Sequence, residues 1–200
     1  MEIVCLDLEG VLVPEIWINV AERTGIEALR ATTREIPDYD QLMAQRLTIL
    51  DEHGLGIDDI QEVIACMTPM QGALDFVESL RARYQLVILS DTFYEFAEPL
   101  MAQLNWPTLF CHRLQLDKTR ISGYTLRMEN HKYAAVKAFK ALNFKVLAAG
   151  DSYNDTAMLE AADLGVLFRA PANVIAEFPH LRVCDDYKNL NEIFDKARTA

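Results

Sequence analysis

The sequence predicts an α/β protein in which a doubly wound, Rossmann-like parallel sheet carries a small helical cap domain as an insertion. The first observation is that short apolar runs alternate with helical segments over most of the chain, which is typical of a parallel sheet with right-handed crossovers. The second is that the stretch after the first apolar run has helical periodicity and contains no strand-like run. A chain of 200 residues is long enough for one such domain with a smaller one inserted.

A buried strand is expected at the amino terminus, where residues 3–6 form an apolar run. The run ends in Asp7 and Glu9, which are separated by one residue, and Gly10 then allows a sharp turn. Because ligands bind at the carboxyl ends of the strands in open α/β sheets, the two acids indicate catalysis or metal binding. A pair of solvated loop acids is the alternative, and the segments further along the chain argue against it.

The insertion is expected to fold over this edge of the sheet as a cap. The predicted domains are a core of residues 1–13 and 70–200 and a cap of residues 14–69. Apolar residues recur in the cap at helical spacing, with breaks expected at Gly25, around Pro37-Asp38 and at His53-Gly54. Pro69 stops a helix and Gly72 precedes the next one, which places the second boundary near residue 69.

Beyond the insertion, strands and helices are expected to alternate along the chain. The predicted strands lie at residues 85–90, 108–111, 145–149 and 164–168. The predicted helices lie at residues 73–83, 94–104, 132–142, 154–162 and 190–197. A polar turn with Gly123 joins residues 114–116 to residues 124–126, and this pattern predicts a β-hairpin.

Polar residues follow two further strands of the predicted sheet. Ser90, Asp91 and Thr92 stand where a helix should begin, so they either cap that helix or help its free N–H groups to bind a phosphate. These residues alone do not decide between the two interpretations. Asp151 and Asp155 follow another strand in the segment 150–155, which by itself also reads as a turn with a cap.

Four carboxylates are thus expected at one edge of one sheet, where like charges repel by several kcal/mol without a counter-ion. Mg²⁺ is the cofactor that this predicts, because it prefers oxygen ligands and also neutralises a bound phosphate. Lys132 opens a helix that leads back to the same edge and could bring its ammonium group there. The alternative is a solvated lysine like the others nearby.

Composition narrows the possible partners. A net charge of -11 argues against nucleic acid and anionic membranes as partners, because those are usually met by clustered Lys and Arg. No signal-like segment or membrane-spanning apolar run is evident, so a small-molecule ligand and a cytoplasmic location are expected. The four histidines are dispersed and are interpreted as surface or structural residues, and the scattered cysteines as reduced thiols.

The ordered set of motifs resembles the haloacid-dehalogenase-like phosphohydrolases. The resemblance rests on residues 7–11, Ser90, Lys132 and the segment 150–155, and it spans essentially the whole chain. The helical insertion, Glu15, residues 45–46, residues 68–69 and residues 72–73 are similar to the phosphoserine phosphatase group. Within that group, the amino-acid sequence around Ser90 and Asp151 is most similar to the bifunctional type that also transfers the phosphoryl group to homoserine.

This resemblance implies a fold, a reaction and residue roles. It implies the haloacid-dehalogenase fold, with Asp7 attacking phosphorus to form an aspartyl-phosphate and Glu9 handling protons. Mg²⁺ would bind Asp7, the backbone carbonyl of Glu9 and Asp151, with Asp155 holding the water molecules of the metal. Ser90 and Lys132 would bind phosphoryl oxygens. The remaining residues of the phosphate site would be Asp91, Thr92 and Asn154.

The resemblance also implies how an amino acid is recognised. Arg46 would pair with the carboxylate of phosphoserine and Glu15 with its ammonium group, while Tyr39 would line the pocket. The chain departs from the common family pattern at Glu9, where Asp is usual, and at Asp91, where many members have glycine. Alternatives that stay open are a phosphatase for another small phosphorylated metabolite and a receiver-like module phosphorylated on Asp7. The expected oligomeric state is a monomer or a homodimer.

Overall fold

The computed structural model, which describes residues 1–32, 36 and 38–199, contains one seven-stranded sheet in the order β4-β3-β2-β1-β5-β6-β7. The strands are β1 (Glu2–Leu6), β2 (Gln85–Phe93), β3 (Thr108–Asp117), β4 (Arg120–Thr125), β5 (Lys145–Gly150), β6 (Leu164–Phe168) and β7 (Arg182–Cys184). The neighbouring strands run parallel, except that β4 is antiparallel to β3. Since β1 lies between β2 and β5, the three strands with polar residues at their ends are adjacent.

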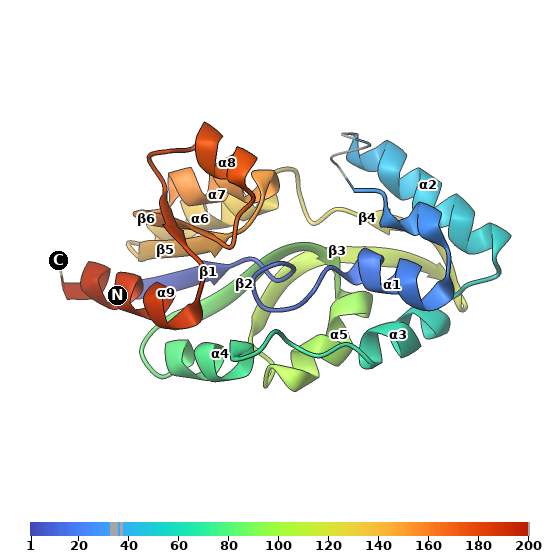
Figure 1. Cartoon of the computed structure of the whole chain (residues 1–200), viewed down its shortest axis with the longest axis horizontal. Coiled ribbons are helices and arrows are strands. Elements are labelled where there is room, and N and C mark those ends of the chain that lie inside the picture. Colours follow the sequence, from blue (N-terminus) through green and yellow to red (C-terminus); the bar gives the residue numbers. More distant parts are fainter. Residues whose placement is uncertain (33–35, 37, 200) are drawn as a thin grey trace.

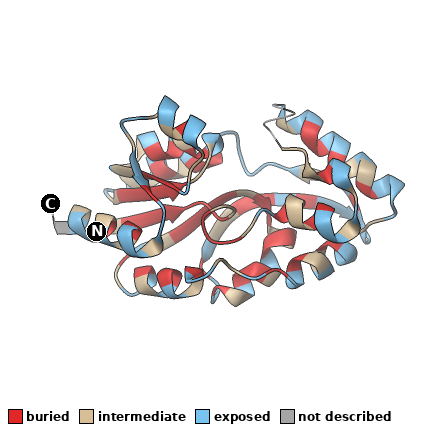
Figure 2. Cartoon of the chain, in the orientation of Figure 1, coloured by how far each residue is buried: buried red, intermediate tan, exposed pale blue. Residues whose placement is uncertain are grey.

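Alternate residues of the strands face two layers of helices. In β1, Ile3 and Cys5 pack toward one layer, and Val4 and Leu6 toward the other. Figure 1 shows the two layers on opposite sides of the sheet, and Figure 2 shows that the strands between them are mostly buried. One layer comprises α6 (His131–Ala141), α7 (Thr156–Ala161) and α8 (Ala172–Glu177), and the other comprises α4 (Ala73–Arg81), α5 (Tyr94–Gln103) and α9 (Tyr187–Thr199). This confirms the predicted doubly wound sheet.

The insertion between β1 and α4 is helical, as predicted. It forms α1 (Ile16–Thr24), the 3₁₀ helix η1 (Glu27–Arg30), α2 (Tyr39–Glu52) and α3 (Ile57–Ala65). Two predicted breaks are confirmed, because Gly25 and Gly54 follow α1 and α2 with φ of 70° and 65°. At the third, the Asp38 side chain accepts a hydrogen bond from the backbone N–H of Gln41 and starts α2, whereas Pro37 lies outside the described residues.

The helices of the insertion share a hydrophobic core with the layer formed by α4, α5 and α9. Trp17 of α1 packs edge-to-face on Phe96 of α5, with 5.5 Å between ring centroids. Tyr39 of α2 packs in the same way on Tyr124 of β4, at 5.8 Å. The antiparallel hairpin of β3 and β4 therefore reaches under α2, as Figure 1 shows, and supports the insertion.

Some elements differ from the prediction. The predicted strand 108–111 and the first arm of the hairpin are one continuous strand, β3. Neither α8 nor β7 was predicted, because six and three residues are too short for a recognisable period. The last helix begins at Tyr187, ahead of the predicted start at residue 190. Within the described part of the chain, no helix is long and apolar enough to cross a membrane.

Candidate active site

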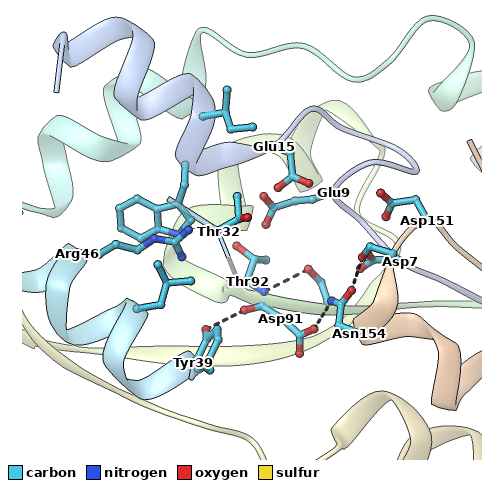
Figure 3. A pocket seen from close by; sticks show the side chains of 15 residues that line it. Asp7, Glu9, Glu15, Thr32, Tyr39, Arg46, Asp91, Thr92, Asp151 and Asn154 are labelled. Atoms are coloured by element: carbon cyan, nitrogen blue, oxygen red, sulfur yellow. Dashed lines mark hydrogen bonds between the residues drawn. The ribbon is translucent and has the colours of Figure 1, made fainter. Parts of the chain in front are cut away.

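The carboxyl ends of β1, β2 and β5 meet at a cavity of about 380 Å³, which α1 and α2 border on the opposite side (Figure 3). Ten of the predicted site residues line it: Asp7, Glu9, Glu15, Tyr39, Arg46, Ser90, Asp91, Thr92, Asp151 and Asn154. The other two, Lys132 and Asp155, lie behind Asp7, where the Lys132 ammonium group contacts both carboxylates. The fold therefore brings the whole predicted set together.

Lys132 is buried among three carboxylates. Its Nζ donates to Asp7 Oδ1 at 2.9 Å and to Asp155 Oδ1 at 2.8 Å, and lies 3.3 Å from Asp91 Oδ2. Burial by itself lowers the pKa of a lysine, but Asp155, Asp7 and Asp91 outweigh it and hold the pKa of Lys132 well above its usual range. The lysine is thus charged, and the alternative of a solvated lysine is wrong.

Three acids could hold a divalent cation. One carboxylate oxygen from each of Asp7, Asp151 and Asp155 lies within 4.8 Å of the others. Burial and the nearby Asp155 raise the pKa of Asp7 well above its usual range, and burial with Asp155 raises the pKa of Asp151 to about 7. These acids therefore repel one another unless a cation or protons compensate, and an oxygen-only set of this kind fits Mg²⁺.

Asp155 has less capacity left to bind a cation than Asp7 and Asp151 have. Its Oδ2 accepts the backbone N–H groups of Asp151 and Ser152, at 3.0 and 3.1 Å, while its Oδ1 accepts from Lys132. Because both oxygens already hold partners, Asp155 chiefly shapes the loop that presents Asp151. The oxygens of Asp151 itself point toward the cavity (Figure 3).

Gly10 makes room for the Asp151 carboxylate. It has φ of 76°, and a Cβ atom at this position would lie 2.5 Å from Asp151 Oδ2. We expect Gly10→Ala to cost about 1–3 kcal/mol in backbone strain and to displace Asp151. Mg²⁺ affinity measured by calorimetry should fall while the variant stays folded by circular dichroism. Gly25→Ala, which also has positive φ but nothing within 4 Å, is the matched control and should keep wild-type affinity.

Glu9 extends away from Asp7 toward the insertion. Its Oε2 accepts the backbone N–H of Ile16 at 2.8 Å, in the first turn of α1. Burial, followed by the adjacent Glu15 carboxylate, raises the pKa of Glu9 to about 8. This raised pKa favours the protonated form of Glu9 near neutral pH, which suits the side chain to donate a proton to a group in the cavity.

Arg46 is the cation at the far end of the cavity. Its guanidinium lies over the Trp17 ring at 4.5 Å from the centroid and donates to the carbonyl of Ala31 at 2.9 Å. Arg46 Nε has no partner among the described residues, and burial lowers the pKa of Arg46 to about 10. Arg46 remains charged at neutral pH and can pair with an anionic ligand. It is 7 % exposed, so Arg46 is not a solvated surface residue.

Ser90 and Thr92 do not cap a helix. Strand β2 runs through both residues to Phe93, which is itself the residue preceding α5. The backbone N–H of Thr92 donates to Ser90 Oγ at 3.3 Å, and both side chains are buried at the wall of the cavity. Of the groups that were predicted to bind a phosphate here, the Ser90 hydroxyl remains, but these residues are not at a helix N-terminus.

Two histidines near Asp91 were not predicted to belong to the site. His112 of β3 and His131 of α6 are each 3 % exposed, so they are not surface residues. His131 Nε2 lies 3.0 Å and His112 Nε2 lies 3.5 Å from Asp91 Oδ1. The position of His131 beside Lys132 was the one signal in the sequence that could have suggested it. Trp17, Thr32 and Ser152 also line the cavity without having been predicted.

Comparison with known proteins gives consistent matches. A family model described as haloacid dehalogenase-like hydrolase matches residues 1–163. Phosphoserine phosphatase ThrH of Pseudomonas aeruginosa is 62% identical over 198 residues, covering 98% of this chain and 97% of that protein. A phosphoserine phosphatase of Pseudomonas syringae pv. tomato is 61% identical, covering 98% of this chain and 84% of that protein.

Solved structures share the fold. A phosphoserine phosphatase in apo form superimposes with a TM-score of 0.77 at 22% identity, covering 97% of this chain and 98% of that one. A phospho-aspartyl intermediate analogue of phosphoserine phosphatase gives 0.78 at 20% identity, covering 96% and 98%. With the family model matching most of the chain, the same fold and two highly similar relatives, the chain belongs to the haloacid dehalogenase-like hydrolases, in the group of the phosphoserine phosphatases.

Proposed function

We propose that this protein hydrolyses O-phospho-L-serine through an aspartyl-phosphate on Asp7. The observation that carries the proposal is the cavity itself, which has Asp7 at one end and Arg46 at the other, with Glu15 between them. A phosphorylated amino acid has complementary groups, namely a phosphate, an ammonium and a carboxylate. The two relatives at 62% and 61% identity are named as phosphoserine phosphatases, which supports the same substrate here.

The proposed reaction has two displacements at phosphorus. In the first, the free oxygen of Asp7 forms a bond to phosphorus while the ester bond to the serine oxygen breaks, and Glu9 donates its proton to that oxygen. In the second, Glu9, now a carboxylate, takes a proton from water, which attacks phosphorus and releases Asp7. Lys132 and the Ser90 hydroxyl stabilise charge on the phosphoryl oxygens in both steps.

Mg²⁺ is the proposed cofactor. Asp7, Asp151 and the backbone carbonyl of Glu9 would hold it, and Asp155 would orient its water molecules. Bound there, Mg²⁺ supplies a positive charge that polarises the phosphoryl group and offsets the repulsion among the acids. The raised pKa values of Asp7 and Asp151 support a site that is incomplete in charge without a cation.

Mg²⁺ affinity is expected to rise with pH through about 7. Burial and Asp155 raise the pKa of Asp151 to about 7, and the protonated acid cannot serve as a ligand. Titration calorimetry should therefore give an affinity about tenfold lower at pH 6 than at pH 8, with proton release visible on changing the buffer. Equal affinities at the two pH values would contradict the assignment of Asp151 as a ligand.

Substrate choice is proposed to come from residues 14–69 acting as a cap over a core of residues 1–13 and 70–200. The cap contributes Glu15 for the ammonium group, Arg46 for the carboxylate and Tyr39 for the wall. Arg46 is held by Trp17 and the Ala31 carbonyl, which would fix its direction before substrate binds.

Arg46→Ala is expected to raise the KM for O-phosphoserine at least about tenfold, because a buried charge pair to the substrate carboxylate is lost. The turnover of para-nitrophenyl phosphate, which lacks a carboxylate, should change by less than about threefold. Steady-state kinetics on the two substrates separates these effects. Arg23→Ala, on the partly exposed end of α1, is the control and should leave both unchanged. An unchanged KM for O-phosphoserine in Arg46→Ala would remove Arg46 from the substrate site.

Transfer of the phosphoryl group to homoserine is a second proposed activity. Glu9 reaches from the Asp7 end of the cavity to Glu15, so the proposed proton carrier lies close to where an amino-acid side-chain hydroxyl would sit. Homoserine has the same ammonium and carboxylate groups as serine, and its hydroxyl could take the place of water once serine leaves.

One experiment tests both activities. The protein is incubated with Mg²⁺, O-phosphoserine and homoserine, and phosphorus NMR follows inorganic phosphate and phosphohomoserine. If inorganic phosphate is the only product, the proposed hydrolysis stands and the proposed transfer to homoserine is wrong. If neither product forms and another phosphorylated metabolite in a substrate panel is turned over, that metabolite replaces phosphoserine as the proposed substrate.

A further inference from the structure

The Asp91 carboxylate lies close to four side chains at the edge of the cavity, those of His112, His131, Lys132 and Asn154. On one side, its Oδ1 faces His131 Nε2 at 3.0 Å and His112 Nε2 at 3.5 Å. On the other side, its Oδ2 accepts a hydrogen bond from Asn154 Nδ2 at 2.6 Å and lies 3.3 Å from Lys132 Nζ. The carboxylate thus bridges two buried histidines and two residues of the phosphate end of the cavity.

His131 meets Asp91 as a hydrogen-bond donor, and His112 presents its Nε2 to the same oxygen at 3.5 Å. The backbone N–H of Arg127 donates to His112 Nδ1 at 3.1 Å, so that nitrogen is unprotonated and the proton of neutral His112 lies on Nε2. His131 presents Nε2 to the same carboxylate oxygen, and its Nδ1 has no partner among the described residues. A carboxylate accepts only, so both Nε2 atoms carry their protons toward Asp91.

This arrangement argues against a metal site at Asp91, His112 and His131, although their ligand atoms lie within 4.8 Å of one another. A neutral histidine that binds a metal through Nε2 must carry its proton on Nδ1. At His112 that position faces the N–H of Arg127, and two donors cannot pair. The cluster is therefore built to hold a carboxylate.

The direction of Asp91 explains why a carboxylate is tolerated beside a phosphate site. A free aspartate there would repel a phosphoryl group, as like charges do. In this structure the side chain turns toward Asn154, away from Arg46 and Glu15 (Figure 3). Its negative charge therefore faces the Lys132 ammonium group, which also contacts Asp7.

We propose that His112 and His131 are positioning residues that hold Asp91, so that Asp91 in turn fixes Lys132 and Asn154 at the phosphoryl end of the active site. The proposal rests on the proposed phosphatase function and gives Asp91 a role other than direct phosphate binding. Asp91 also accepts a hydrogen bond from Tyr39 on its backbone carbonyl at 3.3 Å, so the same unit ties α2 to the site.

The test uses His131→Leu, His131→Gln, Asp91→Asn and the double variant His131→Leu with Asp91→Asn. The loss of His131 acts on the reaction through Lys132, which stabilises the phosphoryl charge. His131→Leu should therefore lower kcat about tenfold or more and change KM less than about threefold. Removal of a residue that orients a ligating group typically has an effect of this size. His131→Gln retains a donor near the position of Nε2 and should recover most of kcat. In the Asp91→Asn background, His131→Leu should change kcat less than about twofold, because the two residues act as one unit.

The proposal would be overturned if His131→Leu kept the wild-type kcat, or if it lowered kcat by the same factor in the wild-type and the Asp91→Asn backgrounds. His180→Leu removes an exposed histidine that pairs with Glu160, so it is the matched control and should match wild type. If wild-type protein does not turn over O-phosphoserine, the proposed function fails, and the same series with para-nitrophenyl phosphate still tests the positioning role.

A second measurement uses the wild-type protein alone, without a substrate or a variant. Long-range proton–nitrogen NMR of the wild-type protein at neutral pH reports which ring nitrogen of each histidine carries the proton. Nε2 of His112 and Nε2 of His131 should both carry a proton. A proton on Nδ1 of His112 with an unprotonated Nε2 would overturn the role of this residue in holding Asp91.

Discussion

Asp7→Asn is expected to lose phosphatase turnover by about 10⁴-fold or more, because an amide lacks the nucleophilic carboxylate oxygen that forms the covalent intermediate. The substitution keeps the shape of the side chain beside Lys132, so the fold should persist. Release of inorganic phosphate from O-phosphoserine in saturating Mg²⁺ measures the loss. Turnover within about tenfold of wild type would rule out Asp7 as the nucleophile.

Two controls separate chemistry from stability in this variant. Asp75→Asn changes an exposed aspartate of α4 and should leave turnover unchanged. In Mg²⁺-free buffer, the Tm of Asp7→Asn should not fall below that of wild type. The reason is that burial and Asp155 raise the pKa of Asp7 well above its usual range, so the metal-free fold disfavours the Asp7 charge that the variant removes.

Lys132→Met is expected to lower kcat by about 10²–10³, the range seen when a donor to developing charge is removed. Methionine fills a similar volume but leaves Asp7, Asp155 and Asp91 without their shared cation. Uncompensated buried charge of this kind costs about 3–5 kcal/mol of stability. Thermal unfolding should therefore show a lower Tm, most clearly without Mg²⁺.

Kinetics on the folded fraction at high Mg²⁺ then distinguishes a catalytic loss from unfolding. Lys137→Met, which removes an exposed lysine from the same helix, is the matched control and should keep both Tm and kcat. A normal kcat for folded Lys132→Met would limit this lysine to a structural role among the three acids.

The sequence by itself determined the class of fold and the place of the site. Apolar runs such as residues 3–6 and 145–149 are local patterns, so they predict buried strands without knowledge of their neighbours. Acids that directly follow such runs must lie at the carboxyl edge of a parallel sheet, which is why Asp7 and Asp151 could be placed together. The short elements β7 and α8 escaped prediction, because their few residues show no period.

Only the tertiary structure decided how these groups share protons and charge. The pKa of Glu9, about 8, depends on burial and on Glu15, which approaches it through the path of the chain into α1. Likewise, His112 and His131 meet Asp91 because strand order and helix packing join three segments that are distant in the sequence. Periodicity specifies which face of an element is buried but not which polar side chains meet across elements, so this contact could be seen only in the folded chain.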